Sequence, residues 1–255
     1  MRLVINIQSQ PPKPNIQHQE RSELKLKVAD LIVEFEPRYD VMKSRVKQYI
    51  YEGEKEPDII INLSEQFFLD RQKENPLLPL AEVEGIFTGA YFYNELVKFG
   101  GVLLHASCVQ YENSAYLFSA DSGTGKSTHT HLWLKKFPKA EILNDDKPAI
   151  RYIDGKYYAF GTPWSGKNDE SINTKTEIAG ITFLSRGENN EIERVEGNTA
   201  TIDFLNQTVR PTNKNYMLQF MDTLDKVLTE VPIYRLKCNM SLEAVETSYN
   251  AMRRK

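Results

Sequence analysis

One stretch constrains this chain more than any other. Residues 120–127 read Ala-Asp-Ser-Gly-Thr-Gly-Lys-Ser, which is the phosphate-loop pattern with alanine in place of its first glycine. An apolar run typical of a strand precedes it at 115–119, and residues 127–136 have the pattern of a helix. The sequence therefore predicts a strand, a glycine turn and a helix, which is the structural context that this pattern requires.

The residue types in this loop suit an anionic ligand. Glycines at 123 and 125 can adopt backbone angles that other residues avoid, so that successive N–H groups turn inward around an anion. The positive end of the helix dipole adds to that attraction. The alternative is a glycine turn that only caps a helix. We assign contacts with nucleotide phosphates to Ser122, Gly123, Thr124, Gly125, Lys126, Ser127 and Thr128.

Composition excludes several classes of protein. With 255 residues, 40% of them hydrophobic and 26% charged, the chain is predicted to form one large or two small globular domains. A net charge of −3 offers no basic surface for nucleic acid, and no apolar run is long enough to cross a membrane. Residues 1–7 are too short and polar for a signal peptide, and Cys108 and Cys238 form no disulfide or zinc pattern. We expect a cytoplasmic protein. These features are compatible with a homo-oligomer.

The chain is predicted to have two parts, residues 1–97 and residues 98–255. The first part is predicted to be a small α+β module in which residues 1–22 form a loose arm or one edge strand, and no chemical constellation is found in it. Its expected elements are strands at 24–28, 31–35 and 59–61, a weaker strand at 46–51, and helices that start at Ser64 and Pro79. Gly100 and Gly101 are expected to end the second helix.

The second part begins with an apolar strand at 102–109 that carries His105 and turns back into the strand before the loop. After the loop helix, the strand at 141–143 ends in Asn-Asp-Asp, and Asp154–Gly155 is the strongest hairpin signal in the chain. Further strands are expected at 178–184, 191–195 and 233–236, and helices at 201–208, 216–230 and after Ser241.

Phosphoryl transfer needs a phosphate cradle with a cation, a magnesium ion, and a group that takes the proton of the attacking hydroxyl. Lys126 is expected to reach the terminal phosphates and Ser127 to hold magnesium. Asp145 and Asp146 suit a division of labour, with one binding magnesium and one acting as base, although a solvated pair at a strand end is the simpler alternative. The residues alone do not assign the two roles.

The histidines are less informative. His105 is either a satisfied core residue or part of the site. His129 and His131 lie two positions apart on the expected helix and face different ways, so we interpret them as structural or solvent-facing rather than as a metal pair.

Together these residues resemble the catalytic domain of the HPr kinase/phosphorylase family. That family has a strand bearing a histidine, a hairpin into a Gly-x-Ser-Gly-x-Gly-Lys-Ser loop, and a strand that ends in Asp-Asp. Here His105, the loop at 120–127 and the pair at 145–146 match, and the resemblance covers about residues 98–250. It implies a mixed-sheet α/β (α+β) fold with a phosphoenolpyruvate-carboxykinase-like nucleotide-binding core, joined here to the small N-terminal module.

The resemblance also implies roles. By it, Asp145 looks like the base for a serine hydroxyl, Lys126 and Ser127 look like the ATP and magnesium ligands, and His105 looks like a residue of the catalytic site. Asp146 is then left as the second magnesium ligand.

The chain departs from the family after the hairpin. The family has a Glu-x-Arg-Gly segment with a magnesium-binding glutamate, whereas residues 161–166 read Gly-Thr-Pro-Trp-Ser-Gly. Asp169 and Glu170 are the candidates that could replace the acid. This stretch looks more like the divergent HPr-kinase-like proteins found beside peptide-modification systems, so neither phosphorylase activity nor HPr as substrate is carried over.

The sequence thus predicts an ATP- and Mg²⁺-dependent kinase that phosphorylates a hydroxyl, with serine of a protein, peptide or small molecule as the expected acceptor. The alternative is a nucleotide-binding regulatory or scaffold module with little or no phosphotransfer. The Asp-Asp pair favours the kinase, and the missing family glutamate favours the module.

Overall fold

The computed structural model describes residues 24–254, so the expected N-terminal arm lies outside the described residues. A small sheet comes first, in the order β1-β2-β3. The elements of this section are β1 (Lys25–Val28), β2 (Leu31–Phe35), α1 (Asp40–Arg45), the 3-10 helix η1 (Val46–Tyr49), β3 (Ile59–Ile61) and α2 (Glu65–Glu74). The predicted cap is confirmed, because Ser64 accepts a hydrogen bond from the main-chain N–H of Phe67 at the start of α2.

The weak strand expected at 46–51 is wrong. Residues 40–49 are helical, with Met42, Val46 and Tyr49 buried on the side that faces the small sheet. These buried positions are three or four residues apart, which is a helical spacing. Only Ile50 makes an isolated bridge, to Leu26 of β1.

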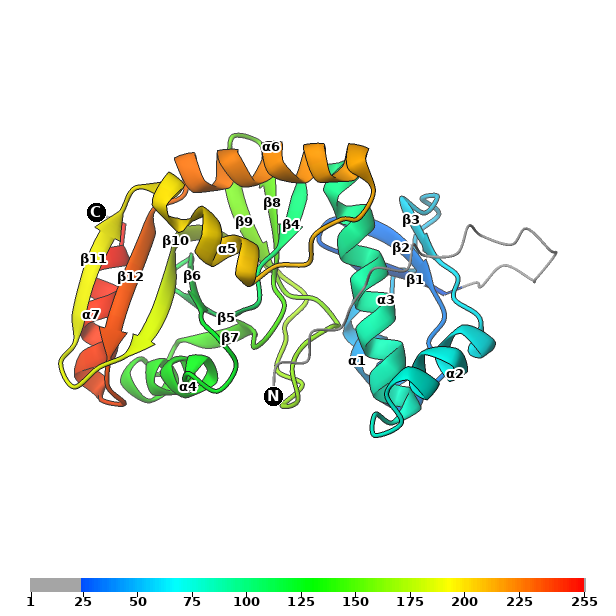
Figure 1. Cartoon of the computed structure of the whole chain (residues 1–255), viewed down its shortest axis with the longest axis horizontal. Coiled ribbons are helices and arrows are strands. Elements are labelled where there is room, and N and C mark those ends of the chain that lie inside the picture. Colours follow the sequence, from blue (N-terminus) through cyan, green and yellow to red (C-terminus); the bar gives the residue numbers. More distant parts are fainter. Residues whose placement is uncertain (1–23, 255) are drawn as a thin grey trace.

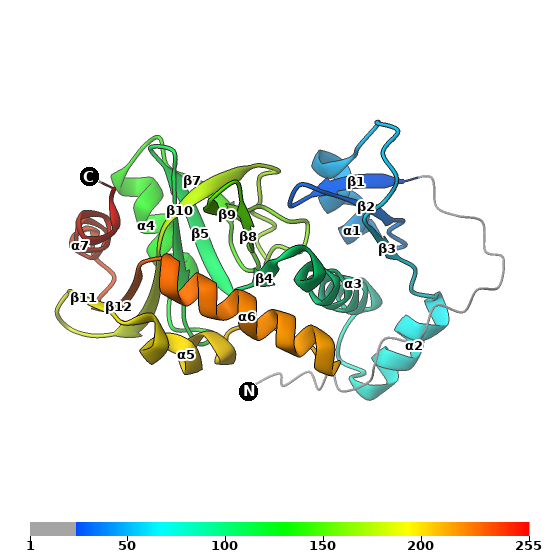
Figure 2. The same cartoon turned by 90° about the horizontal axis from the view of Figure 1, so that it is seen from above.

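Helix α3 (Leu80–Leu96) continues into the 3-10 helix η2 (Val97–Phe99) and leads to the larger sheet. Pro79 precedes its first turn, and Gly100 ends it with a φ of +65°, a left-handed angle that glycine adopts without cost. Figures 1 and 2 show α3 between the small sheet and the larger one.

The larger sheet has nine strands, in the order β4-β8-β9-β10-β6-β5-β7, with β12 paired to β10 and β11 paired to β12. Its first strands are β4 (Gly101–Leu103), β5 (Ala106–Tyr111), β6 (Ser114–Ser119) and β7 (Glu141–Asn144). The others are β8 (Ala149–Ile153), β9 (Lys156–Phe160), β10 (Lys175–Arg186), β11 (Glu191–Val195) and β12 (Ile233–Cys238). The single strand expected at 102–109 is therefore two strands, with His105 in the link between them.

The register brings several strand ends to one edge of this sheet. β10 is parallel to both β6 and β12, while β5 is antiparallel to both β6 and β7. Four strands, β6, β7, β10 and β12, therefore point the same way. The chain segments that leave their carboxyl ends lie along one edge, which is where ligands bind in open α/β sheets.

Helices cover both faces of the sheet. Helix α6 (Lys214–Glu230) packs Phe220, Leu224 and Val227 on the face that contains Leu117, and Figure 1 shows α6 lying across several strands. Helices α4 (Lys126–Lys136) and α7 (Leu242–Met252) pack on the opposite face, against Tyr116 and its neighbours. Successive residues of β6 thus serve different cores, as the alternation of a strand requires. The short η3 (Gly197–Ala200) and α5 (Thr201–Asn206) precede α6.

One hydrophobic core joins the N-terminal section to the larger sheet. It contains Phe92 of α3 together with Phe160 of β9 and Trp164, whose ring stacks on Phe92 with centroids 4.5 Å apart. The division at residues 97 and 98 stays a prediction, and this core is shared across it. Among residues 24–254, no helix is long and apolar enough to span a membrane.

Candidate active site

The loop at 120–125 connects β6 to α4, so the predicted order of strand, turn and helix is confirmed. Gly123 and Gly125 have φ angles of +79° and +125°, and a Cβ at either position would meet nothing within 4 Å. Glycine is therefore required here by backbone conformation and not by lack of space. The N–H of Thr124 donates to the carbonyl of Asp121 at 3.1 Å and closes the turn.

Lys126, the first residue of α4, is buried beneath this loop. Its ammonium donates to the carbonyl of Ala120 at 2.8 Å, at the point where the loop begins. Burial lowers the pKa of Lys126, while the charges of Asp146 and Asp121 act in the opposite direction. Ser127 is half-buried, and Ser122 and Thr128 are exposed on the loop and the first helical turn.

His105 and Asp146 lie side by side at the same sheet edge. His105 Nε2 is 2.9 Å from Asp146 Oδ1, and its Nδ1 is 3.1 Å from Oε1 of Gln207. Gln207 donates through its Nε2 to Asp121 Oδ1, which leaves its carbonyl oxygen facing the histidine. Both ring nitrogens of His105 therefore face oxygen atoms that can accept a hydrogen bond.

The second oxygen of Asp146 pairs with the ammonium of Lys147. Burial acts to raise the pKa of Asp146, but the hydrogen bond from His105 and the charge of Lys147 outweigh it and hold this pKa well below its usual range. The carboxylate therefore stays ionised. The main-chain N–H groups of residues 146 and 147 donate to Asn144 Oδ1 at 3.0 and 2.7 Å, which fixes the turn that presents both aspartates.

Asp145 has a different environment. This residue is 5% exposed, and its Oδ1 accepts a 2.7 Å hydrogen bond from the main-chain N–H of Gly166. Burial raises the pKa of Asp145, and the charges of Asp146 and Glu170 raise it further. The pKa of Asp145 is thus raised and the pKa of Asp146 is lowered from the ordinary value of an aspartate. Adjacent groups whose pKa values are shifted apart in this way are typical of an acid–base pair with separate roles.

The segment 162–165 is packed and not a surface loop. Thr162 and Trp164 are buried, and the indole N–H of Trp164 donates to Thr88 Oγ1 at 3.0 Å. Thr162 Oγ1 lies 2.9 Å from the Tyr93 hydroxyl, and both groups contact the carbonyl of Lys147. Of the two acids considered as replacements, Asp169 accepts from Ser165 Oγ at 2.9 Å and Glu170 pairs with His131 at 3.2 Å.

The N-terminal section contacts this segment directly. Arg45 Nη1 and Nη2 donate to the carbonyls of Ser165 and Gly166 at 3.0 and 2.8 Å, and its Nε is 3.0 Å from Asp169 Oδ1. Farther along, Gln48 and Tyr49 bind Ser171. No sequence signal indicated these contacts, because about 120 positions separate the partners.

The described residues offer oxygen ligands for magnesium near the loop. In the range 24–254, no group of three or more His, Cys, Asp or Glu side chains forms a ready-made metal cluster. Magnesium is usually held by one or two carboxylates with substrate phosphates and water, so Ser127 and Asp146 fit that donor set. Lys147 would then have to release Asp146 Oδ2.

The two helix histidines are placed apart. His129 is 4% exposed, and burial lowers its pKa to about 4. His131 is half-exposed and pairs with Glu170. These contacts agree with the interpretation of His129 and His131 as structural or solvent-facing residues.

Comparison with known proteins yields little. No protein-family model matches the chain. No curated protein matches it either. Among solved structures, the HPr(Ser) kinase/phosphatase from Coxiella burnetii matches 58% of this chain and 94% of its own length, with 11% identity and a TM-score of 0.37. That is a distant likeness of fold, and membership of the family stays a prediction.

Proposed function

We propose that this chain is an ATP- and Mg²⁺-dependent phosphotransferase that transfers the γ-phosphate to a hydroxyl, most simply a serine of a protein, peptide or small molecule. The observation that carries the proposal is the meeting, at one sheet edge, of the glycine loop with the pair Asp145 and Asp146. The charge of Asp146 acts on the pKa of Lys126, so the two groups lie within electrostatic reach of each other.

The loop would bind the nucleotide phosphates. Its backbone N–H groups and the amino end of α4 attract anions, and Lys126 adds a full positive charge. The ammonium of Lys126 donates to the carbonyl of Ala120. Binding would exchange this neutral carbonyl for phosphate oxygens, which form stronger, charge-assisted hydrogen bonds.

Ser127 and Asp146 would hold magnesium, which neutralises charge on the phosphates when it is bound. The low pKa of Asp146 supports this role, because only the ionised carboxylate is a good ligand. His105 would keep that carboxylate oriented through its 2.9 Å contact.

Asp145 would take the proton of the attacking hydroxyl. A raised pKa makes a carboxylate a better proton acceptor, and the hydrogen bond from Gly166 fixes one of its oxygens. The electrostatics thus support the same division of roles that the family resemblance implies.

A nucleotide-binding module with little or no phosphotransfer is the second candidate. The observation that favours it is that both oxygens of Asp146 already have partners, the His105 ring at Oδ1 and the Lys147 ammonium at Oδ2. In addition, the segment 161–166 supplies no acid.

The test is transfer of labelled γ-phosphate from ATP with magnesium, first to free L-serine and then to protein and small-molecule fractions of a cell extract. Asp145→Asn keeps the oxygen that accepts from Gly166, so it should bind ATP normally and lose transfer by about 10²–10⁴-fold. Label on an acceptor that disappears with this variant supports the kinase. Tight ATP binding with no transfer to any fraction supports the module and contradicts the kinase.

A further inference from the structure

One glutamine far along the chain contacts both the glycine loop and the histidine beside the acidic pair. Gln207 directly follows α5 and is 9% exposed. Its main-chain N–H donates to the carbonyl of Phe204 at 2.9 Å. Phe204 is buried in the core that α6 forms with the larger sheet. The backbone of Gln207 is therefore held in place by the fold.

The main chain around Gln207 is bonded to the link between β4 and β5, where His105 lies. The N–H of His105 donates to the carbonyl of Gln207 at 2.7 Å. The hydroxyl of Thr208 donates to the carbonyl of Leu103 at 2.5 Å. Ser119, the last residue of β6, donates through its Oγ to the carbonyl of His105 at 2.8 Å. Both main-chain polar groups of His105 are thus bonded, so only the orientation of its ring remains to be set.

The side-chain amide of Gln207 sets that ring. Its Nε2 donates to Asp121 Oδ1 at 2.9 Å, since a carboxylate oxygen accepts. The other end of the amide, Oε1, therefore lies 3.1 Å from His105 Nδ1. An amide oxygen only accepts, so Nδ1 carries a hydrogen in this contact. Nε2 is then the ring atom that faces Asp146 Oδ1, at 2.9 Å.

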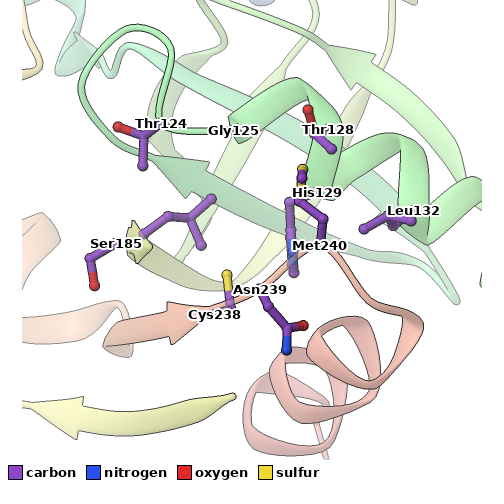
Figure 3. A pocket seen from close by; sticks show the side chains of 10 residues that line it. Thr124, Gly125, Thr128, His129, Leu132, Ser185, Cys238, Asn239 and Met240 are labelled. Carbon is purple, nitrogen blue, oxygen red and sulfur yellow. The ribbon is translucent and has the colours of Figure 1, made fainter. Parts of the chain in front are cut away.

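The loop has different neighbours along its length. Thr124 and Gly125 border a small cavity beside β10 and β12 (Figure 3). Asp121 lies at the start of the loop, where Gln207 binds it. A carboxylate there repels phosphate, so the group that holds it bears on the proposed site. The amide thus connects the start of the loop, rather than its glycines, to His105.

We propose that Gln207 is a positioning residue, whose amide fixes the ring of His105 against Asp146 and joins both to the glycine loop through Asp121. Its effect on phosphoryl transfer rests on the proposed function, whereas the orientation of the ring does not. Gln207 acts through His105, which orients the Asp146 carboxylate. Orientation matters because a misplaced group in a catalytic site lowers the rate even when the ligand still binds.

The simpler alternative is that Gln207 only fills space at the end of α5. Gln207→Met tests this, because it keeps the length of the side chain and removes both polar atoms. Gln207→Glu keeps the oxygen that faces His105 but places a second carboxylate against Asp121. Adding Asp121→Asn to Gln207→Glu reverses donor and acceptor and restores the bond. Gln219→Met, an exposed change on α6, is the matched control.

The ring of His105 is observed by long-range proton–nitrogen NMR of the full chain labelled at histidine, with no ligand added. Its signals are assigned by comparison with His105→Asn. We expect Nδ1 to carry a hydrogen in the wild type and in Gln219→Met. In Gln207→Met the signals of both ring nitrogens should shift, because Nδ1 loses its acceptor. A residue that only packs would leave them unchanged.

Turnover and ATP affinity are measured on the same variants by γ-phosphate transfer and calorimetry. Gln207→Met should lower turnover about tenfold to hundredfold with ATP affinity unchanged. Gln207→Glu should also lower turnover, because two carboxylates then face each other. The double variant with Asp121→Asn should be about tenfold more active than Gln207→Glu alone, because one hydrogen bond is regained.

Two outcomes overturn the proposal. If Gln207→Met has the ring signals of the wild type, Gln207 does not set His105. If the double variant is no more active than Gln207→Glu, the bond to Asp121 contributes nothing. If the wild type transfers phosphate to no acceptor, the proposed function fails, and the ring signals alone decide: a shift in Gln207→Met supports the positioning role and unchanged signals overturn it. If Gln207→Met does not fold in thermal unfolding, Gln207→Glu and the double variant decide.

Discussion

The main-chain N–H of Gly166 donates to Oδ1 of Asp145 across 2.7 Å, which ties the segment after β9 to the carboxylate after β7. The approach is close enough that a Cβ at position 166 would lie 3.0 Å from both oxygens of Asp145. The segment at 161–166 supplies no acid, but its last residue provides the main-chain N–H that fixes one oxygen of Asp145.

Gly166→Ala should displace Asp145 without touching the glycine loop at 120–125. We expect the turnover number to fall about tenfold to hundredfold with ATP affinity unchanged, because small misplacements of a catalytic group are costly. Transfer kinetics and ATP calorimetry check this. Gly85→Ala is the control, since a Cβ there meets only Met42 Sδ, at 3.5 Å. Equal turnover in the two variants would contradict the role given to Gly166.

Lys126→Ala should weaken ATP binding about 10–100-fold, because a charge-assisted hydrogen bond to phosphate is lost. Lys135→Ala is the matched control, since Lys135 is exposed on the same helix. Calorimetry with ATP and magnesium measures both. If Lys126→Ala binds ATP as tightly as the wild type, the proposal that the loop at 120–125 binds nucleotide phosphates is wrong.

Arg45→Met should lower activity by loosening the segment at 165–166, whose carbonyls Arg45 binds. The change removes two hydrogen bonds to the carbonyls of Ser165 and Gly166, so we expect lower turnover with little change in ATP affinity. Added guanidinium ions should restore part of the activity, a rescue that general loss of stability would not give. Lys43→Met, an exposed change on the same helix, should behave like the wild type. If Arg45→Met has normal turnover and added guanidinium changes nothing, Arg45 does not support the site.

Gly89→Ala and Gly85→Ala should change stability in opposite directions. Alanine favours a helix interior over glycine by up to about 1 kcal/mol, so Gly85→Ala should stabilise. A Cβ at Gly89 would lie 2.9 Å from Cδ1 of the buried Trp164, and we expect a net loss of about 1–3 kcal/mol. Thermal unfolding of both variants is the measurement. Stabilisation by Gly89→Ala would mean that Trp164 can move aside.

Glu84 should make stability depend on pH. Its buried carboxylate accepts from the N–H groups of Arg38 and Tyr39 at 2.6 and 3.1 Å, and burial raises its pKa above the ordinary 4.5 despite these bonds. A raised folded-state pKa contributes stability that is present below 4.5 and lost as pH rises through the folded-state value. The advantage of the wild type over Glu84→Gln in urea unfolding should be larger at low pH. A constant difference would contradict the raised pKa.

Local patterns predicted much of this fold. The hairpin at Asp154–Gly155 has positive φ angles at both turn residues, as this residue pair indicated. The loop at 120–125 and the caps at Ser64 and Ser241 follow from short-range chemistry in the same way. Each of these features depends on residues that lie within about four positions of one another, so a local sequence pattern is enough to predict it.

Features that depend on distant partners could not be predicted. The expected strand at 46–51 is helical because Val46 and Tyr49 pack into a core supplied by other segments. β5 lies between β6 and β7, and β6 and β7 point the same way, an order that depends on pairing between distant segments. Arg45 and Gln207 reach the site from more than 80 positions away, and a single sequence carries no signal for such pairs.

Strand β10 has a mechanical consequence. It is one strand from Lys175 to Arg186, which pairs first with β9 and then with β6 and β12, and its register against β6 shifts between Ile178 and Gly180. Because this one strand belongs to both halves of the larger sheet, a movement of one half against the other would bend it at that shift. The segments at 120–125 and 239–241 lie beyond the strand ends, and we expect them to move over a bound nucleotide more readily than the paired strands do.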